Sequence, residues 1–421
     1  MKVQKKVRLL ATVCGLGLAI GGGVGPAFAQ AGNAEFQTFF VNACAASSGA
    51  LANQCAVSNG GDLSGDSESS LNPNQTAVAA SNALAKAQAL AAQTEARLEA
   101  LRDEENGKPG ADTGRIAGFG PWSIFANFEA EWFDQDRQPY ANERAYDGDR
   151  FRGTAGVDYR LNAATHIGLS LSYEDYTSSF VADLPGRNFV PQANGGGVKN
   201  EAFAATVFAS SMLGENAWID SSAGIGWSDY DFRRNAVFQE STRTIAQTNV
   251  SATGSANGKQ YFASLGLGYD FSSGALSIGP YVRGRWTRST IDAYAENDPG
   301  GTGLALNVSK QKANSLTGIL GLDMSYAIGA SWGVIVPQAR IEYEHEFDDD
   351  PRTTLTSLVL DSANTPFAIT NDAPDRDYFN AGIGLVFVLP GGVMPFIDYE
   401  ALIGYSNLKR HRVAAGIRLE L

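Results

Sequence analysis

Apolar and polar residues alternate with a period of two along most of the chain, from Pro121 onward. In the first such segment Trp122 and Ile124 fall on one face, whereas Ser123 and Asn127 fall on the other. A period of two places successive side chains on opposite faces of a β-strand. The pattern recurs in about twelve segments of roughly 9–14 residues, the length that a tilted strand needs to cross a bilayer. The chain is therefore predicted to be mainly β.

The connections between the predicted strands are alternately short and long. The short ones are tight turns at 162–165, 213–216, 272–274, 329–332 and 390–392, and the long ones are polar stretches at 134–149, 177–199, 233–258, 294–312 and 348–375. Aromatic residues such as Trp122, Trp132 and Trp286 lie near segment ends. Short periplasmic turns, long outer loops and aromatic girdles are typical of outer-membrane barrels. We predict an all-β fold, a twelve-stranded antiparallel transmembrane β-barrel over residues 121–421.

A long alanine-rich segment precedes the strands. Residues 75–105 contain no glycine or proline, Asn74 or Thr76 is suited to cap the start of a helix, and a linker at 107–120 follows. At 1.5 Å per residue this helix is roughly 45 Å long, enough to cross a bilayer, yet it is too polar to face lipid. We expect the helix, assigned to residues 74–106, to lie inside a wet and narrow barrel lumen. A solvent-exposed or coiled-coil spacer is the alternative.

The polar strand faces are expected to line that lumen. They hold many glycines, which leave space for a helix, and they carry charges of both signs. The polar residues predicted to face the helix are Glu129, Glu131, Arg152, Asp158, Arg283, Arg285, Arg340 and Glu342. We expect them to form hydrogen bonds with the helix, with one another and with water.

The N-terminus has the three parts of a secretory signal peptide. Four positively charged residues precede an apolar segment at 9–20, and Ala27 and Ala29 form an A-x-A cleavage site. Removal of residues 1–29 changes the formal net charge from −13 to −17. The mature chain is therefore expected to be exported and acidic, and it has no basic field that would attract nucleic acid.

Two cysteines, Cys44 and Cys55, remain after this cleavage. In an oxidising compartment such a pair most often forms a disulfide, and unpaired thiols are the alternative. A zinc site is disfavoured because no histidine lies near either cysteine. The surrounding residues 30–73 are small and polar, with a short helix expected near 36–50 and turns or linker around 59–67. We expect this surface stub to be too short to bury much of a core.

The order of polar helix, twelve strands and terminal strand resembles the autotransporter β-domain family over residues 74–421. The segment 337–347, Pro-Gln-Ala-Arg-Ile-Glu-Tyr-Glu-His-Glu-Phe, is similar to the family's W/Y-x-H-x-F strand, and 396–404 is similar to its penultimate strand. The ending is similar to the outer-membrane assembly signal, with Gly416 followed by alternating apolar positions. The residues assigned to this signal are Gly416, Leu419 and Leu421. The terminal residue is Leu421, whereas the family usually ends in Phe or Trp.

This resemblance implies a helix threaded through the pore, so that residues 30–73 emerge outside the cell. It also implies three partners, namely outer-membrane lipid, lipopolysaccharide and the barrel-assembly machinery. Two features depart from the family pattern. Family members usually carry passengers of hundreds of residues, and the stub is far shorter. The chain also has no Asn-Asn dipeptide, which does not support the pore-side self-cleavage of part of the family.

No cofactor, metal site or enzymatic activity is predicted. The three histidines, His166, His345 and His411, are scattered, and the Gly65-Asp66-Ser67 sequence has no histidine near it to act as a base. The acidic run at 346–350 lacks the spacing of a calcium loop. The sequence therefore predicts an outer-membrane barrel that anchors or displays a short N-terminal segment. The alternatives are a surface adhesin that acts through its outer loops, a helix-gated pore, and a lipid-cleaving barrel.

Overall fold

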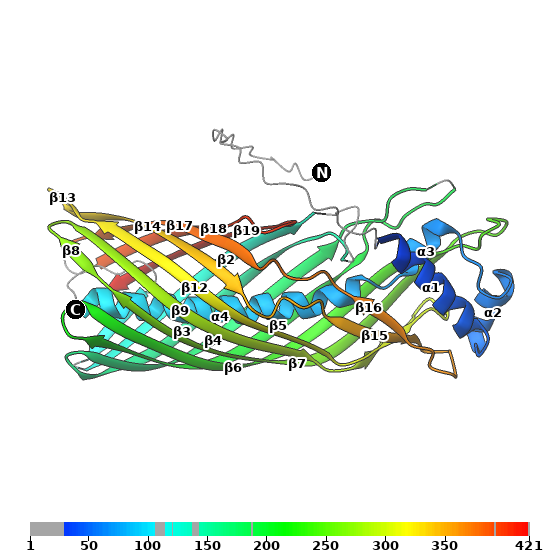
Figure 1. Cartoon of the computed structure of the whole chain (residues 1–421), viewed down its shortest axis with the longest axis horizontal. Coiled ribbons are helices and arrows are strands. Elements are labelled where there is room, and N and C mark those ends of the chain that lie inside the picture. Colours follow the sequence, from blue (N-terminus) through cyan, green and yellow to red (C-terminus); the bar gives the residue numbers. More distant parts are fainter. Residues whose placement is uncertain are drawn as a thin grey trace.

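The barrel wall dominates the computed structural model, which describes residues 29–105, 114–119, 121–136, 143–186, 188–390 and 393–419. Within these ranges the wall has twelve long strands, which are β2 (Trp122–Gln135), β3 (Tyr146–Asn162), β4 (Thr165–Phe180), β5 (Gly196–Leu213), β6 (Ala217–Phe238), β7 (Thr248–Tyr269), β9 (Leu276–Ile291), β12 (Gln311–Tyr326), β14 (Gly333–Glu346), β17 (Asp377–Val388), β18 (Val393–Ile403) and β19 (Leu408–Leu419). Each pairs antiparallel with the next, and β19 pairs with β2 to close the barrel (Figure 1). The predicted fold class is confirmed.

Three short strands complete the wall. β1 (Gly114–Phe119) pairs with the start of β2, while β8 (Phe271–Ser273) and β13 (Ile328–Ala330) extend two tight hairpins. The two hairpin extensions lie at the end of the barrel where the C-terminus is marked in Figure 1. This end, with its short connections, is called the turn end below.

The wall alternates between an apolar outer face and a polar inner face. On β9, Val282 and Trp286 point outward and are 48% and 41% exposed, whereas the neighbouring Arg283 and Arg285 are buried inside. The apolar outer face carries no protein cover, which a water-soluble barrel would need. The alternation is therefore that of a strand between lipid and lumen, as the period of two predicts.

Two strands extend far past the length that a bilayer requires. β6 and β7 have 22 residues each and stay paired from Ala217↔Tyr269 to Phe238↔Thr248. The prediction of a long polar loop over 233–258 is therefore wrong for most of its length. Beyond the membrane the inward positions of β7 carry small residues such as Val250, Ala252 and Gly254, and β6 has Arg233 and Arg234 side by side, so this stretch has the small and polar composition of a loop.

A second, four-stranded sheet forms from the segments at 294–312 and 348–375, which were predicted to be irregular loops. Its strands are β10 (Tyr294–Ala295), β11 (Leu306–Val308), β15 (Thr353–Leu358) and β16 (Phe367–Thr370). These strands have two to six residues each, too few for a reliable alternating pattern in the sequence. They lie at the end opposite the turn end (Figure 1). We call this the long-strand end.

The N-terminal stub folds into three helices at the long-strand end, which we call the cap. They are α1 (Ala29–Cys44), α2 (Gly49–Val57) and α3 (Gly65–Leu71), in place of the single helix predicted near 36–50. The cap has a buried apolar core that it builds together with the outer strands, whereas the sequence predicts a stub too short to bury much of a core. Phe36 and Phe39 contact Phe367 of β16 at ring-centroid distances of 5.3 and 5.1 Å, and Phe40 contacts Phe238 of β6 at 6.2 Å.

The cap core is shared between segments that are far apart in the sequence. It joins the cap residues Phe36, Phe39, Phe40, Ala43, Leu51, Leu63 and Leu71 to Phe238, Val250, Leu304, Leu306, Val308, Leu358, Phe367 and Ile369. Polar contacts add to it, because the Ser67 hydroxyl donates to the Val237 carbonyl (3.1 Å) and accepts from the Gln239 N–H (3.0 Å). About 44 residues do not make this core alone; the strand extensions and the second sheet supply the other half.

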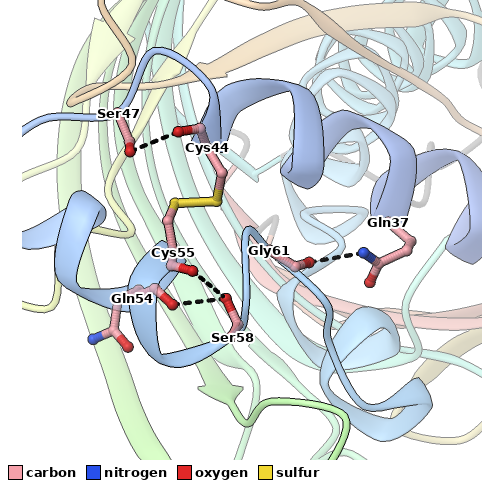
Figure 2. The surroundings of a disulfide bond; sticks show 7 residues. All are labelled: Gln37, Cys44, Ser47, Gln54, Cys55, Ser58 and Gly61. Carbon is pink, nitrogen blue, oxygen red and sulfur yellow. Dashed lines mark hydrogen bonds between the residues drawn. A yellow bond between two sulfur atoms is a disulfide. The ribbon is translucent and has the colours of Figure 1, made fainter.

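A disulfide between Cys44 and Cys55 joins the end of α1 to α2, which confirms the predicted pairing (Figure 2). The turn that follows packs against it. Gly61 has a φ of +102°, and a Cβ there would lie 3.1 Å from the Cys44 sulfur. Its carbonyl accepts a hydrogen bond of 2.7 Å from the Gln37 side chain of α1. A glycine is required at this position because of its positive φ and because a Cβ would lie too close to the Cys44 sulfur.

Candidate functional site: the plug helix and the barrel lumen

The helix α4 (Gln75–Glu105) runs along the inside of the barrel from the cap to the turn end (Figure 1). Its alanines have high helix propensity and keep the helix narrow. It packs chiefly against the strands from β5 to β12. None of the helices in the described ranges has both the length and the apolar character that a membrane-spanning helix needs.

Buried ion pairs connect α4 to the wall. Lys86, near the cap, lies 3.3 Å from Glu174 of β4 and above the rings of Tyr176 and Tyr230. Nine residues further along the helix, Glu95 lies between two cations of β9, 2.5 Å from Arg285 and 3.3 Å from Arg283. Each of these charges is almost inaccessible to water and is matched by an opposite charge.

The last third of α4 repeats this arrangement with cations on the helix. Arg97 is paired with Asp158 of β3, and Arg102 is paired with Asp220 of β6. The Arg102 guanidinium also lies 3.7 Å from the ring of Trp218. A guanidinium suits such a site because it binds a carboxylate and stacks on an aromatic ring at the same time.

Neutral hydrogen bonds fill the intervals between the ion pairs. The Gln93 amide donates to Asn127 (2.8 Å) and accepts from the Thr154 hydroxyl (2.8 Å), so both ends of its side chain are satisfied by β2 and β3. On the other side of the helix, Gln88 donates to the Ser315 hydroxyl of β12 at 3.0 Å. The rotation of α4 about its axis is therefore specified from several directions.

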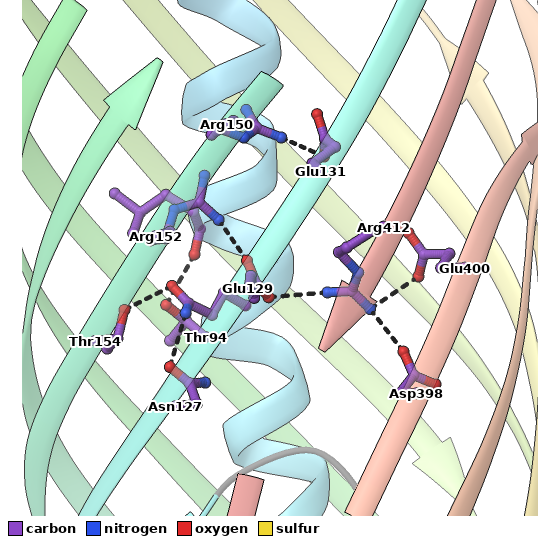
Figure 3. Close-up of polar contacts among 12 residues, drawn as sticks. Thr94, Asn127, Glu129, Glu131, Arg150, Arg152, Thr154, Asp398, Glu400 and Arg412 are labelled. Carbon is purple, nitrogen blue, oxygen red and sulfur yellow. Dashed lines mark hydrogen bonds and ion pairs between the residues drawn. The ribbon is translucent and has the colours of Figure 1, made fainter. Parts of the chain in front are cut away.

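A second network lies within the wall, at the seam where the barrel closes (Figure 3). Glu129 of β2 accepts from Arg152 of β3 (2.9 Å) and from Arg412 of β19 (3.0 Å). Arg412 continues to Asp398 (3.3 Å) and Glu400 (3.2 Å) of β18. Four neighbouring strands are thus linked by charged side chains across the closure of the first strand on the last.

These contacts specify the position of α4 in the lumen more than they add to the folding stability of the barrel. A buried ion pair gains little over an apolar pair of the same shape, because both charges lose their water. Removing one partner is different, because it leaves an unpaired charge and costs about 3–5 kcal/mol. The wall therefore discriminates strongly against a helix with a different charge order or a different depth.

The helix does not fill the lumen. A cavity of about 50 Å³ lies between the small residues Ala89, Ala92 and Ala96 of α4 and polar side chains of β9, β12, β14, β17, β18 and β19. A second cavity of about 140 Å³ at the long-strand end shares Tyr378 and Arg410 with it. The alanines that make the helix slim thus leave two small adjoining polar gaps beside it, which we call the passage.

The predicted lumen residues divide into two groups. Asp158, Arg283, Arg285 and Arg340 contact α4 directly, the last through Glu99 at 3.4 Å. The other four contact wall residues in the described structure. Glu129 contacts Arg152 and Arg412, and Glu131 contacts Arg150. Arg152 also contacts Glu174, and Glu342 contacts Tyr281. A sequence pattern gives the face on which a side chain lies but not the height at which the helix presents its own charges.

Two charged wall residues that pair with α4 are absent from the eight residues predicted to face the helix. They are Glu174, which pairs with Lys86, and Asp220, which pairs with Arg102. Both stand at inward positions of their strands, and both helix cations are visible in the sequence. Matching each buried helix cation to an inward acid at the same depth would have found them, but depth requires the strand register.

The residues assigned to processing and assembly are placed only in part. Ala27 and Leu421 lie outside the described residues, and Ala29 is the first residue of α1. Gly416 pairs with Phe396 of β18, and a Cβ there would lie 2.6 Å from the Phe396 ring. Leu419 pairs with Val393. Their roles in cleavage and in barrel assembly stay predictions.

The described residues contain no group of three or more His, Cys, Asp or Glu side chains that could hold a metal ion. The lumen carboxylates are instead matched by arginines and one lysine. What the arrangement provides is a pore occupied by a helix, with a polar passage left beside it. A barrel of this construction defines a class, the membrane barrels that hold their own N-terminal helix.

Residues 124–400 match the family described as autotransporter beta-domain, and this chain belongs to that family. The chain is similar in structure to the translocator domain of the autotransporter NalP from Neisseria meningitidis, with a TM-score of 0.54 at 15% identity over 80% of this chain and 98% of that one. The beta domain of the Bordetella autotransporter BrkA matches with a TM-score of 0.45 at 15% identity, over 72% of this chain and 100% of that one. No curated protein matches the sequence. Family and fold place the barrel in an outer membrane.

Proposed function

We propose that this barrel displays residues 30–73 on the cell surface as a folded cap that stays attached to its own outer strands. The observation that carries the proposal is the core shared by the cap, the ends of β6 and β7 and the second sheet. A segment that is released after export does not need a core shared with the barrel. A segment that is displayed in one orientation needs such a core to hold it in place.

The direction of α4 supports the same proposal. The cap lies at the long-strand end, whereas the tight hairpins lie at the turn end (Figure 1). Short turns face the periplasm in outer-membrane barrels, and the long connections face outward. The helix therefore leads from the periplasmic side to the cap on the outside, and its ion pairs hold it at one depth.

An epitope inserted after Gly60 tests the display. Gly60 lies in the exposed turn after α2, and open space surrounds it. We expect an antibody to label intact cells that carry this insertion. The matched control is the same epitope after Gly274, in the tight turn before β9, which also has open space around it. This epitope should be labelled only after the outer membrane is permeabilised. Labelling of the Gly274 epitope alone on intact cells would overturn the proposal.

A second function, a helix-gated pore, is supported by the passage beside α4. Single-channel recordings in planar bilayers should show a small conductance for the whole chain and a several-fold larger one after deletion of residues 75–105. Ala92→Trp, which places a large ring in the cavity, should lower the small conductance without removing the helix. Equal conductance in all three proteins would exclude this function.

A further inference from the structure

The outer face of the barrel has an uneven distribution of charge near the long-strand end. On five of the twelve long strands, the outward position two residues beyond an exposed aromatic residue is acidic. These acids are Asp134, Asp175, Glu201, Asp229 and Asp377, beyond Trp132, Tyr173, Phe203, Trp227 and Phe379 respectively. An acidic rim agrees with the negative net charge of the chain.

Three neighbouring strands break this rule with cations. Lys259 of β7 lies two residues beyond Tyr261, Arg288 of β9 lies two residues beyond Trp286, and Lys312 of β12 is the second residue of its strand. All three stand at outward positions. Lys259 and Lys312 flank Thr290 of β9 in one register row, which puts their backbones about 10 Å apart. We call these three residues the cationic patch.

The cationic patch has no counter-charge of its own. In the described part of the chain none of its three residues forms an ion pair, and Asp292, just beyond it on β9, is occupied by Lys310 at 2.8 Å. Asp229 of β6 is two residues from Trp227, the register partner of Lys259. It lies on the side of β7 away from β9 and β12, and therefore away from Arg288 and Lys312. Three unpaired cations on a lipid-facing wall indicate that the missing anions belong to the membrane.

An apolar groove lies below the cationic patch on the same strands. Gly284 of β9 and Gly318 of β12 are register partners on the outward face, and a Cβ at Gly284 would meet nothing within 4 Å. The groove has a volume of about 390 Å³, and its walls include Leu265, Val282 and Leu320. Gly284 is four residues from Arg288, about 13 Å along the strand. The groove therefore begins within about half of the roughly 30 Å hydrocarbon thickness from the charges.

We propose that the cationic patch and this groove together bind one molecule of a phosphorylated, multiply acylated glycolipid of the outer leaflet. Its phosphates contact Lys259, Arg288 and Lys312, and one of its acyl chains lies in the groove over Gly284. Ordinary phospholipids carry one phosphate and match the patch less well. The proposal rests on the proposed function in one respect, the orientation that places the long-strand end in the outer leaflet.

Native mass spectrometry of the full chain, purified in detergent and folded, tests this site. The probes are bisphosphorylated lipid A, phosphatidylglycerol and phosphatidylethanolamine. We expect lipid A to bind at least about tenfold more tightly to the wild type than to the triple variant K259Q/R288Q/K312Q, because each cation near an anionic headgroup contributes roughly fivefold in affinity. The control R160Q/K199Q/R233Q removes three other exposed cations and should bind like the wild type.

Gly284→Leu tests the groove separately. The leucine fits the open space at this position, so the barrel should fold, and lipid A should bind several-fold more weakly. Equal affinity of the wild type and the triple variant for lipid A, or equal retention of phosphatidylglycerol and lipid A by the wild type, would overturn the proposal. Because the binding is measured in detergent, it does not depend on orientation. A failure of the cap display would appear only in the epitope experiment.

Discussion

The lumen and the cap hold two consecutive parts of one N-terminal segment, and they do so by opposite means. In the lumen α4 is held by buried ion pairs such as Glu95 with Arg285 and Arg97 with Asp158. In the cap α1 is held by phenylalanines that pack on Phe367 and Phe238, with one disulfide alongside.

The two kinds of contact differ in what happens to their surfaces when the two sides separate. A polar helix and a polar wall both remain hydrated if they separate, because water replaces the lost partners. An apolar core cannot separate without exposing its rings to water. The polar lumen contacts can therefore be exchanged for water, whereas the cap core cannot be opened without exposing its rings.

Glu95→Ala should have the largest effect on this comparison. It leaves Arg283 and Arg285 buried beside one another without their shared carboxylate and should destabilise the folded barrel by about 3–5 kcal/mol. Urea unfolding followed by heat-modified gel migration measures the loss. Lys310→Ala breaks an exposed pair with Asp292 and should change stability by less than about 0.5 kcal/mol. Similar losses for both variants would mean that burial does not strengthen the lumen contacts.

Phe40→Ala should damage the cap and spare the barrel. Phe40 is 1% exposed, and its truncation should cost about 3 kcal/mol of local cap stability. Limited proteolysis should then cut between α1 and α3 while the barrel band keeps its heat-modified migration. The neighbouring Val41 is 43% exposed, so Val41→Ala is the matched control and should leave the cap resistant. Loss of the barrel band in the Phe40 variant would show that the two regions unfold as one unit.

Removal of the disulfide should have a smaller effect in the same region. Cys44 and Cys55 are 11 residues apart, and a closed loop of that size contributes about 2–3 kcal/mol through the unfolded state. We expect Cys44→Ala with Cys55→Ala to give a cap that is cleaved several-fold faster but still folds on its aromatic core. A reducing agent should accelerate cleavage of the wild type and leave the double variant unchanged. An equal response of both proteins would exclude the disulfide as the cause.

A pH effect at the outer mouth of the lumen should be the smallest. Burial, together with the nearby charge of Asp372, raises the pKa of Glu143, and the hydrogen bond from Gln135 only partly offsets this. The ionised form is therefore penalised in the folded state, so stability is lost as the pH rises through the raised pKa and is fully present below the ordinary value. Glu143→Gln should raise the unfolding midpoint by about 1–3 °C at pH 7.5 and by nothing near pH 4. A gain that is the same at both pH values would contradict this assignment.

The lumen shows how far the sequence alone leads. The inward faces of the strands and the polar character of α4 follow from periodicity and composition, and both place the helix in the barrel. The partner of each charge does not follow. Arg102 meets Asp220, and Lys86 meets Glu174, because the stagger of the strands brings those residues to the depth of the helix cations. Stagger is a property of all twelve strands together, and no single segment encodes it.

The cap shows the opposite limit. The disulfide follows from two cysteines and an oxidising compartment, but the core does not, because half of it comes from segments that the sequence presents as polar loops. By itself the sequence determined the barrel, its closure by alternating strands and the helix that occupies it, since these depend on local periodicity and length. Only the tertiary structure decided where the N-terminal segment ends up, since that depends on surfaces created when distant segments meet.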